Sequence, residues 1–162
     1  MIDTICFFAE SEPRWIFAEL EEGFDHFNEY KADGGHDPAT DPAASVYIHF
    51  ANGVRAFYNS IKIEMPGSQH ELICEKGQIT VSDRDISVIR GTSHSEWGRT
   101  TVAPDEYWAT FQLDAVAELI HVLEHGGRLV SPGQEGRKTL EIMLAILKSQ
   151  QLSNDRVNLP LG

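Results

Sequence analysis

The chain opens with a pattern that predicts a short helix followed by a β-strand. Apolar residues recur at helical spacing between Ile2 and Ala9, as on the buried side of an amphipathic helix. Pro13 interrupts this pattern, and the alternation over 14–21 is typical of a strand with one buried face. One face carries Trp15, Phe17 and Glu19, and the other carries Ile16, Ala18 and Leu20. Because the helix starts without room for a capping residue, we expect it to be truncated.

Residues 22–42 break the regular pattern. They are rich in Gly, Asp, His and Pro, which predicts a long loop, and a lid role is one interpretation because the loop follows the first strand. Five of its side chains are potential metal ligands: His26, Asp33, His36, Asp37 and Asp41. Their spacing follows neither a zinc nor an EF-hand pattern, so we interpret the segment as a solvated acidic loop.

The next segment predicts a β-hairpin. Strands over 45–50 and 54–61 flank Asn52-Gly53, and Asn-Gly supplies the two positive φ angles of a type I′ turn. With these two residues as the turn, Ala51 pairs with Val54. That register places Val46, Ile48, Phe50 and Phe57 on one face, and Tyr47, His49, Ala56 and Tyr58 on the other. We expect the first face to be core and the second to be open.

A second hairpin is predicted over 71–75 and 78–82, with its turn at Lys76-Gly77. The pairing puts Leu72, Cys74, Ile79 and Val81 on one face, and Glu71, Ile73, Gln78 and Thr80 on the other. Further strands are predicted over 86–90 and 96–102. Because the connections are short, we expect an antiparallel meander.

Two helices are predicted near the end of the chain. The first covers 107–125, with an apolar stripe at Phe111, Ala115, Leu119, Val122 and Leu123, and Gly126-Gly127 is typical of a helix end. The second covers about 132–151, with Ser131 as its N-cap and Pro132 as its first residue. A short strand over 156–159 follows.

Strands followed by helices, rather than strict alternation, predict an α+β fold with a predominantly antiparallel sheet and helices packed on one face. The other face would then be open. Because it would carry Tyr47, Tyr58, Ile73 and His49, we expect it to meet a partner subunit or a ligand.

Composition narrows the partners. With 162 residues the chain fits one domain, 1–162. A net charge of -12 argues against nucleic acid and against anionic membranes. No apolar stretch reaches membrane-helix length, and the start, MIDTICFFAES, lacks the basic segment of a secretory signal. Cys6 and Cys74 have no CxxC spacing, so we expect two reduced, buried thiols in a cytoplasmic protein.

Other catalytic patterns are weak. His121 and His125 stand at helical i and i+4 positions, a geometry that can bind a metal, but nothing completes the ligand set. We interpret them as polar surface and expect no metal site. The serines lack a GxSxG elbow, which argues against a hydrolase.

The order of these elements resembles the carboxy-terminal domain of the glucose-fructose oxidoreductase, inositol dehydrogenase and rhizopine-catabolism (Gfo/Idh/MocA) family. Ile2-Asp3 before an apolar helix is similar to a His-x-x-Asp stretch that opens the family domain. The hairpin at 50–54 and the step Gly77-Gln78-Ile79-Thr80-Val81 resemble two further family features. The closing segments also match: 126–132, Glu135-Gly136-Arg137, Ala145-Ile146, Ser149 and Val157-Asn158-Leu159-Pro160.

The resemblance implies an oxidoreductase that acts on a sugar, cyclitol or related polyol with NAD or NADP. In this family a nucleotide-binding domain precedes the domain seen here, and the open sheet face commonly builds dimers or tetramers. This sequence has no strand followed by GxGxxG, so we expect no cofactor bound to this chain and no activity of the chain alone.

The resemblance also implies site residues. Asp3 matches a substrate-hydroxyl or catalytic-dyad residue; the alternative is an ordinary carboxylate at a helix start. Many members carry a catalytic His four residues after this Asp, where Phe7 stands and cannot move a proton. From the predicted open face, His49, Tyr47 and Tyr58 are candidate polyol contacts, with subunit contact as the alternative.

Two functions therefore stay open. The chain is either the substrate wall and oligomer interface of a dehydrogenase, most simply a homodimer or tetramer, or a binding or dimerisation module without catalysis. A reading frame that continues upstream through a GxGxxG segment and a Glu-Lys-Pro segment would favour the first.

Overall fold

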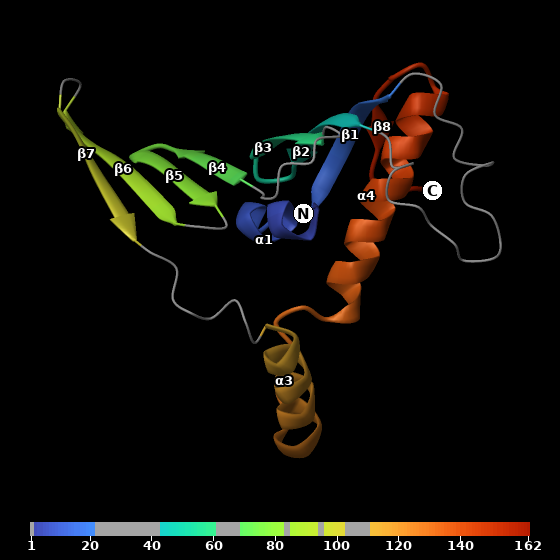
Figure 1. Ribbon diagram of the computed structural model, residues 1–162. Helices are drawn as coiled ribbons and strands as arrows, with labels where there is room; N and C mark the ends of the chain where they lie inside the picture. The colour runs from blue at the N-terminus through green and yellow to red at the C-terminus, as the bar shows by residue number, and fades with distance from the viewer. Residues whose placement is uncertain (1, 22–42, 61–68, 83–84, 94–95, 103–110) are drawn as a thin grey trace. The chain divides into compact units, whose positions relative to one another are not determined.

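The structure is a computed structural model that describes residues 2–21, 43–60, 69–82, 85–93, 96–102 and 111–162. It divides into unit 1, residues 1–63 with 130–162, and unit 2, residues 64–129. Both units contain antiparallel strands and helices, so the predicted α+β class is confirmed (Figure 1). The predicted loop at 22–42 lies outside the described residues. The prediction of one domain over 1–162 stays a prediction.

Unit 1 is a four-stranded antiparallel sheet with two helices against one face. Its sheet order is β3-β2-β1-β8. The elements are α1 (Ile2–Ala9), β1 (Pro13–Leu20), β2 (Ala44–Phe50), β3 (Arg55–Ser60), α4 (Gly133–Gln151) and β8 (Val157–Asn158). The core lies between the sheet and the helices and consists of Cys6, Ala9, Ile16, Ala18, Leu20, Val46, Ile48, Phe50, Ile142, Ala145, Ile146, Val157 and Leu159. The predicted alternation along β1 is thus confirmed.

The edge of β1 beyond the short strand β8 is completed by side chains of α4. The Ser149 hydroxyl accepts a hydrogen bond from the Ala18 amide at 2.9 Å and donates to the Asp155 carbonyl at 2.7 Å. The Leu20 amide donates to the Gln150 side-chain oxygen at 3.0 Å. Because buried backbone groups require partners, these contacts fix α4 to the strand.

The first hairpin has a different register from the predicted one. Its turn contains three residues, 51–53, closed by hydrogen bonds from the Phe50 amide to the Val54 carbonyl and from the Gly53 amide to the Phe50 carbonyl. Gly53 has a φ of 88°, as the last residue of such a turn requires. Opposed positions therefore sum to 104, with Val46 opposite Tyr58.

This shift of one residue reverses every side chain of β3. Ala56 and Tyr58 pack against the core, whereas Phe57 lies on the other face opposite Tyr47. The prediction that Tyr58 and Ala56 lie on the open face, and Phe57 on the core face, was wrong. The cause is physical: side chains alternate with a period of two, so a one-residue change in turn length exchanges the two faces.

Unit 2 contains a four-stranded antiparallel meander in the order β4-β5-β6-β7. Its elements are β4 (Gln69–Cys74), β5 (Gly77–Ser82), β6 (Ile86–Ser93), β7 (Glu96–Val102) and α3 (Phe111–His125). Here Cys74 pairs with Gly77, so the turn residues are 75–76 rather than 76–77. The register changes by two, and the predicted faces of this hairpin are therefore confirmed. A side chain at Gly77, whose φ is 153°, would overlap the Ile89 carbonyl.

The helix ends match the predictions in part. Gly126, with a φ of 76°, follows α3 and its amide donates to the Val122 carbonyl at 2.9 Å, which confirms the predicted end. Pro132 is the N-cap of α4 and no side chain caps this end, so the prediction of Ser131 as N-cap was wrong. Residues 107–110 of the predicted helix lie outside the described residues.

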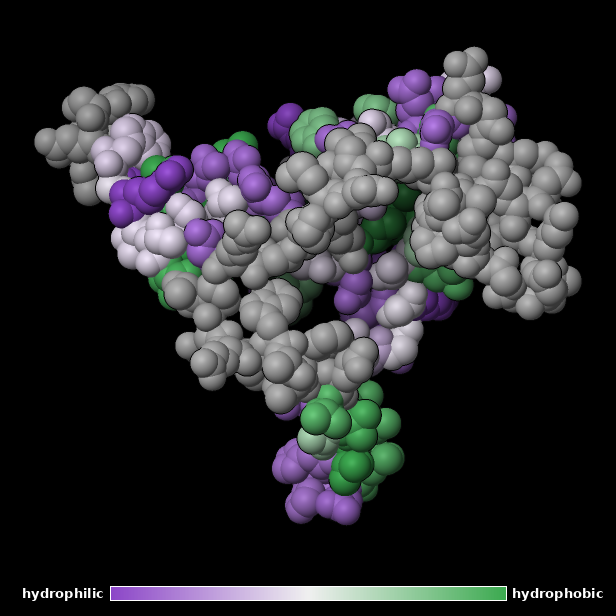
Figure 2. Space-filling model, viewed as in Figure 1, coloured by the Kyte–Doolittle hydropathy of each residue, from purple (hydrophilic) through white to green (hydrophobic). Residues whose placement is uncertain are grey.

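Helix α3 leaves its apolar stripe exposed. Figure 2 shows green side chains gathered along one side of α3 and purple ones along the other. The exposed apolar residues of this helix are Leu113, Val116, Leu119, Ile120 and Leu123. Within the described residues, no helix combines the length and apolarity that a bilayer crossing requires.

Candidate functional site

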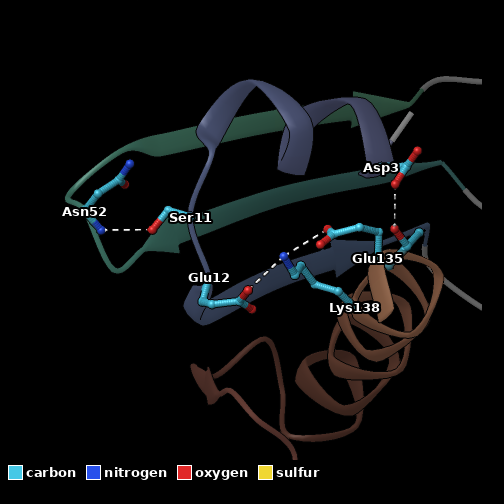
Figure 3. A network of polar contacts seen from close by, with 7 residues as sticks. Asp3, Ser11, Glu12, Asn52, Glu135 and Lys138 are labelled. Atoms are coloured by element: carbon cyan, nitrogen blue, oxygen red, sulfur yellow. Dashed lines mark hydrogen bonds and ion pairs between the residues drawn. The ribbon is translucent and has the colours of Figure 1, made fainter. Parts of the chain in front are cut away.

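Asp3 and Phe7 lie one helical turn apart on the exposed side of α1. Asp3 is in the first turn and is solvent-exposed, and Phe7 is 66% exposed. The Thr139 hydroxyl of α4 lies 3.5 Å from an Asp3 carboxylate oxygen, a long hydrogen bond (Figure 3). The carboxylate therefore keeps lone pairs free to accept hydrogen bonds from a hydroxylated ligand.

The end of α1 is fixed to the turn of the first hairpin. The Asn52 side chain donates to the Ala9 carbonyl at 2.9 Å, and the Asn52 amide donates to the Ser11 hydroxyl at 3.1 Å (Figure 3). The Ala51 amide also donates to the Glu12 carbonyl at 2.8 Å. The Asn-Gly turn thus does more than reverse the chain, because it sets the position of the helix that carries Asp3.

An ion-pair cluster joins the segment after α1 to the first turns of α4. The Lys138 ammonium lies 2.9 Å from a carboxylate oxygen of Glu12 and 2.9 Å from one of Glu135. Partial burial lowers the pKa of Lys138, but hydrogen bonds and charges of both carboxylates outweigh that effect and raise it above its usual value. Lys138 therefore stays protonated and has the role of a structural cation here, not of a general base.

Cys6 lies beneath this cluster in the core. Burial raises the pKa of its thiol to about 11, although the nearby Lys138 charge acts in the opposite direction. Such a thiol is a poor nucleophile at neutral pH. Cys74, by contrast, is exposed on β4, so the prediction of two buried thiols was wrong for Cys74.

The face of the unit 1 sheet that α1 and α4 do not cover carries a layer of aromatic side chains, which we call the aromatic layer. Its residues are Trp15, Phe17, Tyr47, His49 and Phe57. Tyr47 lies parallel to Trp15 and to Phe17, with ring centroids 5.1 Å apart in each pair, and edge-on to Phe57 at 5.0 Å. The guanidinium of Arg156 lies 5.3 Å from the centre of the Trp15 ring.

His49 is held between Trp15 and the strand backbone. Its ring stacks on Trp15 with centroids 5.1 Å apart. Its Nδ1 atom is buried and has no hydrogen-bond partner in the described part of the chain. A buried polar atom of this kind is costly unless another group completes it, which favours a surface that is completed by something else.

The predicted site residues do not form a single site. Asp3 lies on α1, on the helix-covered side of the sheet, whereas Tyr47 and His49 lie on the opposite side. Tyr58 packs against the core. One small molecule cannot touch Asp3 and the aromatic layer together, so the two groups require separate roles.

Several neighbours of these residues were not predicted from the sequence. Thr139, which reaches Asp3, is 136 positions away in the chain, and Arg156 is far from Trp15 as well. The Glu135–Lys138 pair had a signal in its i, i+3 spacing within a predicted helix. Trp15 and Phe17 were assigned to one strand face, but only the strand order places them beside Tyr47.

The described residues offer poor sites for a metal or a dinucleotide. No group of three potential ligands could hold a metal ion among them. His121 and His125 are exposed and stack on each other with centroids 4.7 Å apart. Each described helix carries an acidic residue in its first turn, Asp3, Asp114 or Glu135, which would repel a pyrophosphate at that position.

The fold is similar to part of several solved oxidoreductases. No protein-family model and no curated protein matches the sequence. A putative NADPH-dependent oxidoreductase from Desulfitobacterium hafniense matches 97% of this chain and 45% of its own, with a TM-score of 0.73 and 12% identity. An oxidoreductase domain protein from Kribbella flavida matches 99% and 49%, with a TM-score of 0.74 and 14% identity.

A third match is the WlbA dehydrogenase from Bordetella pertussis, solved with NADH and UDP-GlcNAcA. It matches 99% of this chain and 43% of its own, with a TM-score of 0.57 and 13% identity. The chain thus spans less than half the length of these solved structures, and the likeness establishes a shared fold.

Proposed function

We propose that this chain is the substrate-side and oligomerisation domain of an NAD(P)-dependent oxidoreductase of the Gfo/Idh/MocA family. One observation carries the proposal: almost the whole chain superposes on less than half of each oxidoreductase chain, with TM-scores of 0.73 and 0.74 for two of them. The motifs at Ile2-Asp3, the 50–54 hairpin and 157–160 occur in the order that the family resemblance requires.

The cofactor would be held by a separate nucleotide-binding half. The acidic first turns of α1, α3 and α4 disfavour a pyrophosphate, and the sequence carries no GxGxxG segment. NAD or NADP supplies a hydride acceptor when bound to that half. The isolated 162-residue chain is accordingly proposed to be inactive.

Asp3 is proposed to contact the hydroxyl groups of a sugar, cyclitol or related polyol. Its exposure on α1 and the single long contact with Thr139 support this role, because the carboxylate can still accept hydrogen bonds from a ligand. Phe7, one turn on, offers an apolar surface and no proton-transfer group. Any proton acceptor for the alcohol would therefore come from another residue.

The test uses the complete protein that the gene encodes. Reduction of NAD⁺ or NADP⁺ is measured with a panel of sugars and cyclitols, for the native protein and for Asp3→Asn. We expect turnover that Asp3→Asn lowers by roughly tenfold or more, with Asp114→Asn as the matched surface control. A gene product without a nucleotide-binding half, or without turnover of any polyol, would favour the alternative of a non-catalytic binding or dimerisation module.

The aromatic layer is proposed to form a homodimer or tetramer contact. Phe17 is 43% exposed and Phe57 is 73% exposed, and contiguous exposed aromatic area of this kind is typical of interfaces. A cytoplasmic location completes the proposal, because Cys6 and Cys74 are both free thiols.

A further inference from the structure

The uncovered face of the unit 1 sheet has opposite charges at its two ends. At one end lie His49 and, opposite it on β3, the exposed Arg55. At the other end lie the exposed Glu19 and, opposite it on β2, Ser45, which pairs with Asn59. The aromatic side chains occupy the middle. The face therefore runs from basic through apolar to acidic along the strands.

Arg156 adds its charge to the basic end of β1. It immediately precedes β8, and its guanidinium lies over the Trp15 ring at 5.3 Å from the ring centre. Trp15 and Glu19 are on the same face of β1, two side chains apart on that face, with Phe17 between them. A single strand thus presents a positive group, an aromatic ring and a negative group in a row.

Such a row is self-complementary under one kind of two-fold symmetry. In a symmetric dimer the same patch meets itself, so each charge must meet the opposite charge of the partner. A two-fold axis that runs across the strands places β1 over its own copy in the reverse direction, so that Glu19 meets Arg156 and Phe17 meets Phe17. An axis along the strands would instead bring the two basic ends together, which is unfavourable.

We propose that two copies of this chain pack their aromatic layers face to face with antiparallel β1 strands, held in register by two Glu19–Arg156 pairs between the protomers. This inference rests on the proposed oligomerisation role and specifies its geometry. A second copy fits this face better than a lone polyol, because the charges at the two ends match each other and the rings of the layer pack largely on one another.

Charge exchange tests the pairing directly. The dimer dissociation constant of the 162-residue chain is measured by sedimentation equilibrium for the native chain, Glu19→Arg and Arg156→Glu. Each single reversal replaces two attractions by two repulsions, so we expect each to weaken the homodimer by roughly tenfold or more. An equimolar mixture of the two variants should form a heterodimer with near-native affinity, and the double variant should recover the homodimer.

Arg55→Glu is the matched control, because Arg55 shares the face but would meet the neutral Asn59 of the partner. We expect a smaller effect, and no preferred heterodimer when it is mixed with Glu19→Arg. A native dimer that Phe57→Asp dissociates, but whose single charge variants are not complemented by mixing, would overturn the proposed register and leave the aromatic interface standing. A native chain that stays monomeric at high micromolar concentration would overturn both.

Discussion

At the scale of single residues, Ser149 shows how one hydroxyl joins a helix to a sheet. It is fully buried and serves the Ala18 amide and the Asp155 carbonyl, both of which lie where β8 is too short to pair with β1. The family resemblance singled out Ser149 without assigning it a role. The structure assigns it a structural role, because the hydroxyl completes backbone groups that water cannot reach.

Ser149→Ala should therefore destabilise unit 1. The change leaves a buried amide without its acceptor, which costs about 1–3 kcal/mol. Urea unfolding followed by far-ultraviolet circular dichroism measures the loss. Ser131→Ala is the control: Ser131 is exposed and makes no capping hydrogen bond to α4, so its effect should stay within about 0.5 kcal/mol. A larger loss for Ser131→Ala would restore it as an N-cap.

The two cysteines should differ sharply in reactivity. Burial raises the pKa of Cys6 from 9.0 to about 11, so at pH 8 its thiolate fraction is lower by about a hundredfold than that of an unshifted thiol. In the native chain Ellman's reagent should label Cys74 rapidly and Cys6 more than a hundredfold more slowly. The variant Cys74→Ser isolates the slow phase, and a fast phase in that variant would contradict the burial of Cys6.

The same pKa shift gives the sign of a pH effect on stability. The unfolded thiol ionises near pH 9.0 and the folded one near 11. The contribution of Cys6 to stability is thus fully present below pH 9 and is lost as the pH rises toward 11, because only the unfolded state releases the proton in that window. Cys6→Ala should flatten the fall in urea midpoint between pH 9 and 11; an unchanged fall would assign it to other groups.

At the scale of elements, α4 and α3 have similar amphipathic sequences and opposite roles. Ile142 of α4 is fully buried against the sheet, whereas Leu123 of α3 is 76% exposed. Truncation of a buried Ile costs about 2–5 kcal/mol, because it removes apolar contacts and leaves a cavity. Ile142→Ala should lower the urea midpoint of unit 1 strongly, and Leu123→Ala should change stability by less than about 0.5 kcal/mol. Equal effects would mean that α3 is packed as tightly as α4.

The two hairpins show what the sequence predicts well and what it cannot decide. Both were located from their Gly-containing turns, and seven strands plus three helices match predicted segments closely. Turn length was misjudged by one residue in the first hairpin and register by two in the second. Only the first error exchanged the faces and misplaced Tyr58, because side chains repeat every two positions. A single extra turn residue has no reliable signal in the sequence.

The candidate site was predictable only as far as local pattern extends. Asp3 at a helix start and Tyr47 with His49 on one strand face follow from periodicity. Their separation onto opposite sides of the sheet depends on where α1 and α4 pack, and the Asp3–Thr139 contact joins residues 136 positions apart. Long-range contacts of this kind are set by strand order and helix packing, which one sequence does not reveal.

At the scale of the whole molecule, burial is unevenly distributed. Every described residue that is buried belongs to unit 1. In unit 2 the apolar side chains on one face of the sheet, Leu72, Ile79, Val81, Ile86 and Val88, are only partly buried. Because apolar burial is the main stabilising term, unit 1 should hold most of the stability of the chain.

Hydrogen exchange provides a matched test, because β2 and β5 are both central strands with a neighbour on each side. Their backbone amides are equally well paired, so any difference in protection reports the burial around them. Ile48 of β2 is fully buried, whereas Ile79 of β5 is not. Amides of β2 should therefore exchange at least roughly tenfold more slowly than those of β5 in the isolated chain. Equal protection would require a cover over the unit 2 sheet, and the uneven stability argued from burial would then be wrong.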